Sequence, residues 1–284
     1  MKRPTELVKD EATMHTLLVL TSAFEGIAST HLAHIKNEVL KSNVFFEDLW
    51  QVYSKLRVDE IFHFGRGENK KAVDKELYIL ITAEGGFSGD VDQRLIQFLT
   101  ESYDQTKNDI IVIGKHGIQL LQQRNIPYVK FYNLPIKDLN LNVGPLVKDI
   151  QRYELTSVFY PKYITLSDQK VSRIKLSAFV QELGGSIKVN EDVISEFNYI
   201  FEPSIYEVVN HLEESMLYVA ISQIILDSKL AQYASRFRSM SAAKLVAIKA
   251  SSNLYIQYRH SLRSLQDERL KETINSLRKI RPKV

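Results

Sequence analysis

The chain has 284 residues, of which 44% are hydrophobic and 25% charged, and its formal net charge is +3. This is long enough for one full-sized domain with further elements, and the mild charge does not by itself indicate a nucleic-acid or membrane partner. The absence of cysteine excludes disulfides, thiolate metal sites and cysteine nucleophiles, and is consistent with a reducing compartment. No apolar run reaches the roughly 18 residues that cross a bilayer, and we expect no signal peptide.

The N-terminal part, residues 1–62, is predicted to form one long helix. Residues 8–60 contain one glycine and no proline, and apolar side chains recur at alternating four- and three-residue steps. Such spacing is typical of a coiled-coil seam. The seam positions are Met14, Leu18, Thr21, Glu25, Ala28, Leu32, Ile35 and Val39. We expect the helix to end near residues 65–69, which hold two glycines and several polar residues.

Residues 75–195 change to strands that alternate with helices. Continuous apolar runs predict buried strands, and helical spacing separates them. The predicted strands are 77–81, 109–114 and 128–132, and the predicted helices are 91–99, 118–123 and 144–153. Two further strands, 157–165 and 173–180, are expected to pair as an antiparallel hairpin with a turn near Ser167 and Asp168. This order predicts a mainly parallel sheet with helices on its faces, a Rossmann-like α/β domain.

The C-terminal part, residues 203–284, is predicted to be a second and longer helix. Pro203 breaks the preceding segment, Ser204 is a candidate N-cap, and Glu207 is its capping-box partner. No glycine or proline follows up to residue 281, so the helix would span about 115 Å. Its seam is predicted at Tyr233, Phe237, Met240, Lys244, Ala247, Ser251, Leu254, Tyr258, Ser261 and Leu265.

A helix of that length cannot bury its apolar stripe on a small sheet alone, so it needs a long partner. The N-terminal helix is the only long partner that the sequence offers. The predicted fold class is therefore α/β, with an antiparallel coiled coil of the N- and C-terminal helices and a Rossmann-like central α/β domain.

Four segments resemble the gamma subunit of the rotary F-type ATP synthase. Residues 228–243 read Ser-Lys-Leu-Ala-Gln-Tyr-Ala-Ser-Arg-Phe-Arg-Ser-Met-Ser-Ala-Ala, similar to the family's Ser-x-x-Ser-Glu-His-Ala-x-Arg-Met-x-x-Met-x-x-Ala. Residues 81–92, Ile-Thr-Ala-Glu-Gly-Gly-Phe-Ser-Gly-Asp-Val-Asp, are similar to its Ile-Thr-Ser-Asp-Arg-Gly-Leu-Cys-Gly-Gly-Leu-Asn. Residues 113–117 and 201–203 resemble its Ile-Gly-Lys-Lys-Gly and Tyr-Glu-Pro segments. The order of the four is that of the family.

The chain departs from the family pattern in three places. In the first helix only Lys9 matches the family's basic run clearly. In the strand–loop segment, Gly85 replaces an arginine and Ser88 replaces a cysteine. The small-residue ending is replaced by a basic one, and residues 259–284 carry eight basic and three acidic side chains.

The resemblance implies a non-catalytic central-stalk subunit, a rotating shaft that couples ATP synthesis or hydrolysis to proton translocation. The implied partners are the alpha and beta subunits, the epsilon subunit and the membrane c-ring, with one copy of the chain per complex at the cytoplasmic face of the membrane. No cofactor, metal or catalytic residue is expected. The candidates for subunit contacts are Lys9, Gln232, Arg236, Met240, Arg259 and Arg263.

Alternative interpretations stay open at the level of sequence. The chain could serve a non-standard rotary ATPase, or be a nucleotide-binding α/β protein with a coiled-coil adaptor. It could also be a coiled-coil adaptor or a nucleic-acid-binding protein that uses the basic tail. Segment 84–89 follows a predicted strand but has neither dinucleotide nor P-loop spacing, so a plain turn is favoured. His31 and His34 lie one turn apart, yet only Glu38 could join them as a metal ligand. Gln232 and Arg236 could equally be ordinary flank residues of the coiled coil.

Overall fold

The computed structural model describes residues 3–56, 73–134, 142–185, 200, 202 and 204–280. Contacts divide the chain into two compact units: residues 28–236, here called the core unit, and residues 1–27 with 237–284, here called the terminal unit. This division cuts through both long helices. The ranges 1–62, 75–195 and 203–284 stay a prediction, and the helix end expected at 65–69 lies outside the described residues.

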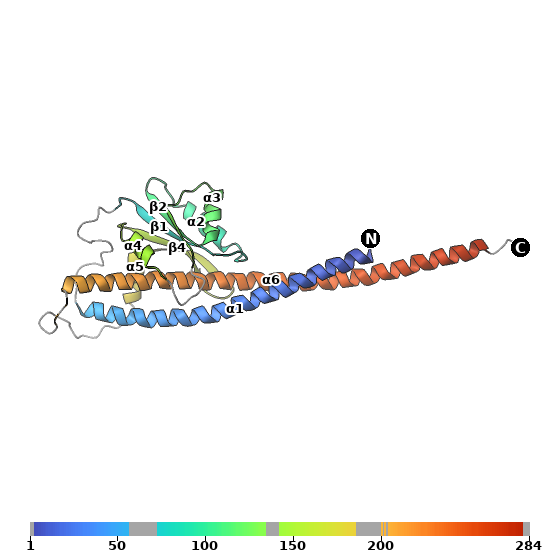
Figure 1. The fold of residues 1–284 in the computed structure, drawn as a ribbon, viewed down its shortest axis with the longest axis horizontal. Coiled ribbons are helices and arrows are strands. Elements are labelled where there is room, and N and C mark those ends of the chain that lie inside the picture. The colour runs from blue at the N-terminus through green and yellow to red at the C-terminus, as the bar shows by residue number, and fades with distance from the viewer. Residues whose placement is uncertain are drawn as a thin grey trace. The chain divides into compact units, whose positions relative to one another are not determined.

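The two long helices are present as predicted. Helix α1 spans Pro4–Lys55 and helix α6 spans Ile205–Ile280 (Figure 1). Helix α1 begins at a proline, which suits the first helical position because its missing N–H would have no partner there. At the start of α6 the backbone N–H of Glu207 donates to Ser204 Oγ at 3.3 Å, which confirms the predicted N-cap.

In the described ranges of the chain, five strands form one sheet in the order β3-β2-β1-β4-β5. The first four are parallel, with Leu80 of β1 opposite both Val112 and Phe159, and β5 runs antiparallel to β4. The strands are β1 (Glu76–Ile81), β2 (Asn108–Ile113), β3 (Lys130–Tyr132), β4 (Thr156–Tyr163) and β5 (Gln169–Lys175), and the shorter helices are α2 (Val91–Thr100), α3 (Lys115–Gln123), α4 (Gly144–Ile150) and α5 (Leu176–Gly185). The predicted α/β class with long terminal helices is confirmed.

Both faces of the sheet are covered, which explains the continuous apolar runs of its central strands. On one face Tyr78 and Leu80 pack with Leu95 of α2 and Leu121 of α3. On the other face the sheet packs against α4 and α6, with Leu217, Ile221, Ile224 and Ile225 of α6 in the same cluster. Helix α6 therefore serves as a covering helix of the sheet within the core unit.

The predicted strand 173–180 is partly wrong. The hairpin exists and its turn lies at Thr165–Asp168, but β5 ends at Lys175 and helix α5 begins at Leu176. Leu176 and Val180 are four residues apart and both buried, a helical spacing, and Val180 packs in a cluster with Phe46 of α1. A short apolar run cannot distinguish a strand from a buried helix by periodicity, and here the contact with α1 decides.

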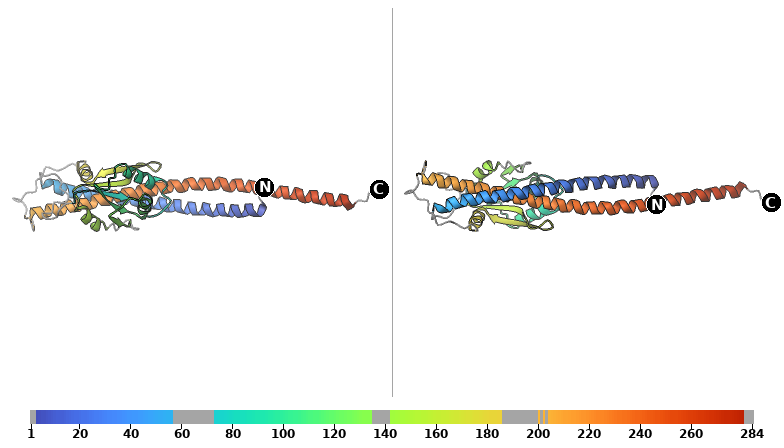
Figure 2. Two further views of the ribbon diagram at one scale, coloured as in Figure 1. Left: turned by 90° about the horizontal axis from the view of Figure 1, so that it is seen from above. Right: turned by 90° about the horizontal axis from the view of Figure 1, so that it is seen from below.

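In both units α1 and α6 pair through the predicted seam. Within the core unit the two helices lie side by side in opposite directions (Figures 1 and 2), with Ile35 packed against Leu226 and Leu230. In the terminal unit the seam residues Met240, Ala247 and Ser261 are buried, and Lys244 Nζ lies 2.9 Å from Glu25 Oε2. All seam positions predicted on α1 and α6 are buried or half-buried, whereas every residue from 266 to 277 is exposed.

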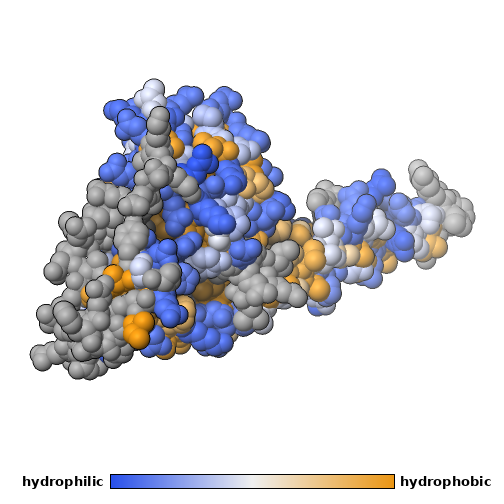
Figure 3. All heavy atoms as spheres, turned by 60° about the vertical axis from the view of Figure 1, so that its left-hand side comes forward, coloured by the Kyte–Doolittle hydropathy of each residue, from blue (hydrophilic) through white to orange (hydrophobic). Residues whose placement is uncertain are grey.

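The surface in Figure 3 is largely hydrophilic, with separate apolar patches among polar side chains. Among the described residues no helix combines the length and the apolar composition that a membrane span requires.

Candidate functional site

The loop after β1, residues 83–90, is held on helix α6. Ser235 Oγ donates to the backbone oxygen of Ser88 at 2.6 Å. The guanidinium of Arg236 donates to two further backbone oxygens, from Nε to Gly86 at 3.3 Å and from Nη2 to Gly85 at 3.4 Å. We call these three hydrogen bonds the clamp. The clamp lies at the carboxyl ends of parallel strands, which is where open α/β sheets usually bind ligands.

Aromatic contacts support the clamp from the side of α1. The Arg236 guanidinium lies 5.1 Å from the ring centroid of Tyr233, a cation–π distance. Tyr233 in turn stacks on His31 of α1, with ring centroids 4.6 Å apart and planes at 9°. Arg236 is thus placed by both long helices, and His31 takes part in this packing.

A buried carboxylate holds the base of the loop. Asp92, in the first turn of α2, is fully buried, and its Oδ2 accepts the Ala83 N–H at 3.2 Å and lies 2.7 Å from His116 Nδ1. The hydrogen bond to Asp92 raises the pKa of His116, against the opposing effect of burial. The ion pair ties the start of the loop to the start of α3.

A second ion pair braces the same loop. Glu84 Oε1 lies 3.0 Å from Lys115 Nζ, and Glu84 Oε2 accepts the backbone N–H of Leu134 at 3.2 Å. Loop 83–90 is therefore fastened to the ends of two neighbouring strands as well as to α6.

Close approach beneath the loop explains the glycines of segment 113–117. Gly114 has φ +98°, and a Cβ on it would lie 2.2 Å from the Thr82 backbone oxygen. The Gly117 N–H donates to Thr82 Oγ1 at 2.9 Å, where a Cβ would again collide. Only glycine fits the first position, because positive φ and contact with backbone coincide there.

Phe87, at the tip of the loop, has φ +67° and is 62% exposed. A bulky residue in this region of φ costs about 1–3 kcal/mol and persists only where surrounding contacts impose it. The clamp bonds on either side of Phe87, at Gly86 and Ser88, are such contacts.

The geometry argues against a phosphate in this loop. Carbonyl oxygens, not N–H groups, point to the cationic side chain of α6, and the loop region carries the carboxylates of Glu84, Asp90 and Asp92. Phosphate sites present N–H groups and positive charge. The tight-turn interpretation is therefore favoured over the nucleotide site. No group of three histidine, aspartate or glutamate side chains that could hold a metal occurs in the described part of the chain.

The predicted contact residues fall into two classes. Lys9, Arg259 and Arg263 are exposed. Gln232 and Met240 are buried, and Gln232 Nε2 donates to Ser228 Oγ at 3.0 Å within the chain. Arg236 belongs to the clamp. Sequence reasoning missed the contact of loop 83–90 with α6, although the two segments that meet there, 81–92 and 228–243, both carry the family resemblance.

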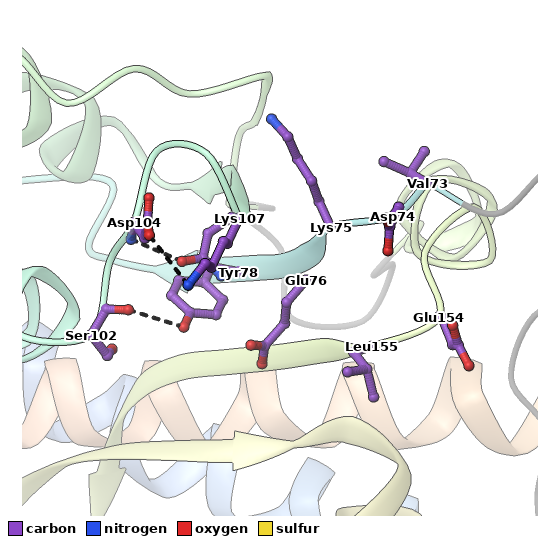
Figure 4. Close-up of a pocket in the computed structure, with 11 residues that line it drawn as sticks. Val73, Asp74, Lys75, Glu76, Tyr78, Ser102, Asp104, Lys107, Glu154 and Leu155 are labelled. Atoms are coloured by element: carbon purple, nitrogen blue, oxygen red, sulfur yellow. Dashed lines mark hydrogen bonds and ion pairs between the residues drawn. The ribbon is translucent and has the colours of Figure 1, made fainter.

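A separate hollow of about 430 Å³ borders the amino ends of β1 and β2 (Figure 4). Lys75 pairs with Asp109 at 2.9 Å, Lys107 lies 3.8 Å from Asp104, and the Tyr78 hydroxyl donates to the Ser102 backbone oxygen. These lining side chains are thus already engaged with neighbouring groups of the chain.

Comparison with known proteins gives consistent results. A family model described as ATP synthase matches residues 12–263. The ATP synthase gamma chain of Macrococcus caseolyticus is 26% identical over 72% of this chain and 74% of its own length, and that of Mycoplasmopsis pulmonis is 23% identical over 90% and 91%.

Solved structures are similar in fold. A chain of the central stalk and c-ring of the Tetrahymena thermophila mitochondrial ATP synthase has a TM-score of 0.57 at 16% identity, covering 79% of this chain and 99% of that one. A chain of the Euglena gracilis mitochondrial ATP synthase rotor has a TM-score of 0.55 at 14% identity, covering 90% and 99%.

Proposed function

The chain belongs to the ATP synthase gamma family, as a non-catalytic central-stalk subunit, and from this membership we propose how it acts. Its paired helices turn inside a ring of alpha and beta subunits and couple ATP synthesis or hydrolysis to proton translocation. One copy stands in each complex, with the epsilon subunit and the membrane c-ring as further partners, at the cytoplasmic face of the membrane. The similarity to central-stalk and rotor chains supports this assembly.

The observation that carries the proposal is an exposed apolar surface near the C-terminal end of α6. The seam is buried down to Leu265, after which Leu270, Ile274 and Leu277 are 61%, 43% and 60% exposed. They follow one another at four and three residues, which is one face of a helix. A helix end with an apolar stripe and no cover from the described chain needs a surrounding partner, and a ring of larger subunits provides one.

The mechanism follows from the asymmetry of two paired helices of unequal length. At each angle such a shaft presents a different surface to each catalytic subunit of a pseudo-symmetric ring. Differential contacts bias the subunits toward different nucleotide affinities, which is a population shift driven by the shaft. Coupling requires stiffness, and the buried and half-buried seam positions of α1 and α6 within each unit favour it.

The exposed cations are the direct contacts that we propose. Lys9, Arg259 and Arg263 are exposed on the terminal unit and would meet acidic loops of the ring. Gln232, Arg236 and Met240 make contacts within the chain, so we propose that they shape the contact surface from inside. The departures in the first helix and the basic ending keep a non-standard rotary ATPase as the second candidate.

Co-expression with the ATP synthase alpha and beta subunits of the same organism tests the proposal. We expect a stoichiometric complex with one copy of the chain. In the complete synthase, with its membrane sector, ATP-driven proton pumping should fall severalfold when Arg259 and Arg263 are both changed to alanine. The matched control is Arg124→Ala, which removes an exposed cation far along the chain from both. Failure of the chain to co-purify with the ring subunits would refute the proposal, and unchanged pumping in the double variant would refute the contact role of the two arginines.

A further inference from the structure

Within the core unit, helix α6 is attached to the α/β domain first by an apolar contact. Leu217, Ile221, Ile224 and Ile225 are each at most 2% exposed and pack into the cluster that covers one face of the sheet. Apolar burial resists separation, and close packing restricts the angle between the packed surfaces, but the hydrophobic effect itself is non-directional. Directional bonds further along the helix would fix the orientation of the domain more firmly.

Polar contacts follow along the same helix. The Tyr218 hydroxyl accepts the Gly144 N–H at 3.1 Å, and the Asp227 carboxylate accepts a backbone hydrogen bond from Tyr163. The clamp at Ser235 and Arg236 comes last. By the rise of an α-helix, it lies about 20 Å along the axis from the centre of the apolar contact.

Two separated attachments fix an orientation more firmly than one. Hydrogen bonds are directional, and the clamp has three, from two successive side chains to three backbone oxygens. The loop that receives them is itself fastened to the strand ends by the Asp92–His116 and Glu84–Lys115 pairs. A force on the loop therefore passes into the sheet.

We propose that the clamp transmits torque between the α/β domain and the helical shaft, with Ser235 and Arg236 as its positioning residues. This inference rests on the proposed rotor function. During rotation the domain is dragged around the axis of α6, and the apolar contact near Ile221 serves as the pivot. The clamp holds the domain on α6 at a second point, away from this pivot, so the domain and the shaft turn together.

The absence of cysteine makes a sharp experiment possible. In the assembled complex, Arg236→Ala combined with Ser235→Ala should lower the ratio of protons pumped to ATP hydrolysed severalfold, while Arg124→Ala should leave that ratio unchanged. A second variant combines Arg236→Ala with Ser88→Cys and Ser235→Cys, which places the chain's only disulfide across the same contact. Oxidation should restore the ratio, and reduction should abolish it again.

The disulfide separates the clamp from a direct contact of Arg236 with another subunit, because the bridge does not replace the guanidinium. An unchanged ratio in the double alanine variant would overturn the proposal, and so would no recovery on oxidation once thiol titration shows that the bridge has formed. Conservative replacement by Arg236→Lys should recover part of the ratio, because a lysine can reach one carbonyl but not two.

Amide exchange on the isolated full-length chain tests the clamp independently of rotation. Arg236→Ala should raise exchange severalfold in residues 83–90 and leave strand β2 unchanged. Unchanged exchange in that loop would overturn the clamp even in a complex that pumps. A different outcome is also possible: the loop exchanges slowly in the unsubstituted chain and faster in Arg236→Ala, yet the unsubstituted chain never assembles with the ring subunits. That outcome would overturn the rotor function, and the torque role with it.

Discussion

Helix α6 passes through two environments in one continuous element. From residue 215 to residue 237, within the core unit up to residue 236, none of its residues is exposed. From residue 238 to residue 265, in the terminal unit, burial returns only every three or four residues. The first stretch is buried or half-buried all round and acts as a piece of domain core, whereas the second has a single buried stripe and acts as half of a coiled coil.

The difference teaches that one part of a helix can stabilise a domain while another part of the same helix extends away as half of a coiled coil. Core contacts surround the first stretch and will make it sensitive to any change of volume. The second stretch contacts its partner on one side only, so changes there should cost little stability and act mainly through the assembled complex. Matched substitutions in the two units can break or sharpen this comparison.

The largest effect is expected from glycines. Gly114→Ala should destabilise the core unit by about 3 kcal/mol or more, because the new Cβ would lie 2.2 Å from the Thr82 oxygen at positive φ. In the terminal unit, a Cβ added at Gly26 would meet no neighbouring atom within 4 Å outside its own helix backbone. Gly26→Ala should therefore stabilise α1 by about 0.5–1 kcal/mol. Denaturant unfolding followed by circular dichroism measures both. Equal effects of the two changes would contradict the comparison.

Leucines on the same helix come next. Leu217→Ala removes a side chain that is 1% exposed and should cost about 2–5 kcal/mol. Leu254→Ala removes a half-buried seam residue and should cost roughly 1 kcal/mol, in line with its smaller buried area. The thermal midpoints of the two variants give the comparison. A larger loss at Leu254 would show that the seam, not the sheet contact, dominates the stability of α6.

The buried carboxyl of α6 should make the core unit sensitive to pH. Burial raises the pKa of Asp227 to about 6, from 3.8 in the unfolded chain. A raised carboxyl pKa favours the folded state most below pH 4, and this contribution is lost as the pH rises to 6. Asp227→Asn keeps an acceptor for Tyr163 and should stabilise the protein at pH 7.5 by at most about 3 kcal/mol.

At pH 4 the Asp227→Asn substitution should have almost no effect. Unfolding at the two pH values measures the difference, with Asp267→Asn, an exposed position on the same helix, as the control. A stabilisation that is the same at both pH values would show that the carboxyl is not charged at a cost in the folded protein.

The smallest effect is expected from the seam ion pair of the terminal unit. The hydrogen bond from Lys244 lowers the pKa of Glu25, so the pair contributes at neutral pH and is lost as the pH falls through that lowered pKa. The two side chains are 18% and 35% exposed, which suggests a coupling of roughly 0.5–1 kcal/mol. A double-mutant cycle with Glu25→Leu and Lys244→Leu measures it. Coupling of several kcal/mol would indicate a pair as buried as the core.

Much of the fold was predictable because its signals are local. The scarcity of glycine and proline and the repeated apolar spacing predicted α1 and α6, and the continuous runs predicted β1 and β2. The boundary at Leu176 was not predictable, since its apolar run suits either a strand or a helix until the contact with α1 is known. In the candidate site, segments 81–92 and 228–243 could be found by their resemblance to the family. Their contact with each other could not be predicted from the sequence.

The sequence by itself determined which stretches are helices, which strands are buried on both faces, and which family the chain belongs to. These properties depend on residues within a few positions of one another. Only the tertiary structure decided that Gln232 faces inward, that Arg236 binds the carbonyls of Gly85 and Gly86, and that Ser235 binds a loop 147 residues away. Contacts between such distant segments arise when the sheet and the long helices pack together, and no local periodicity encodes them.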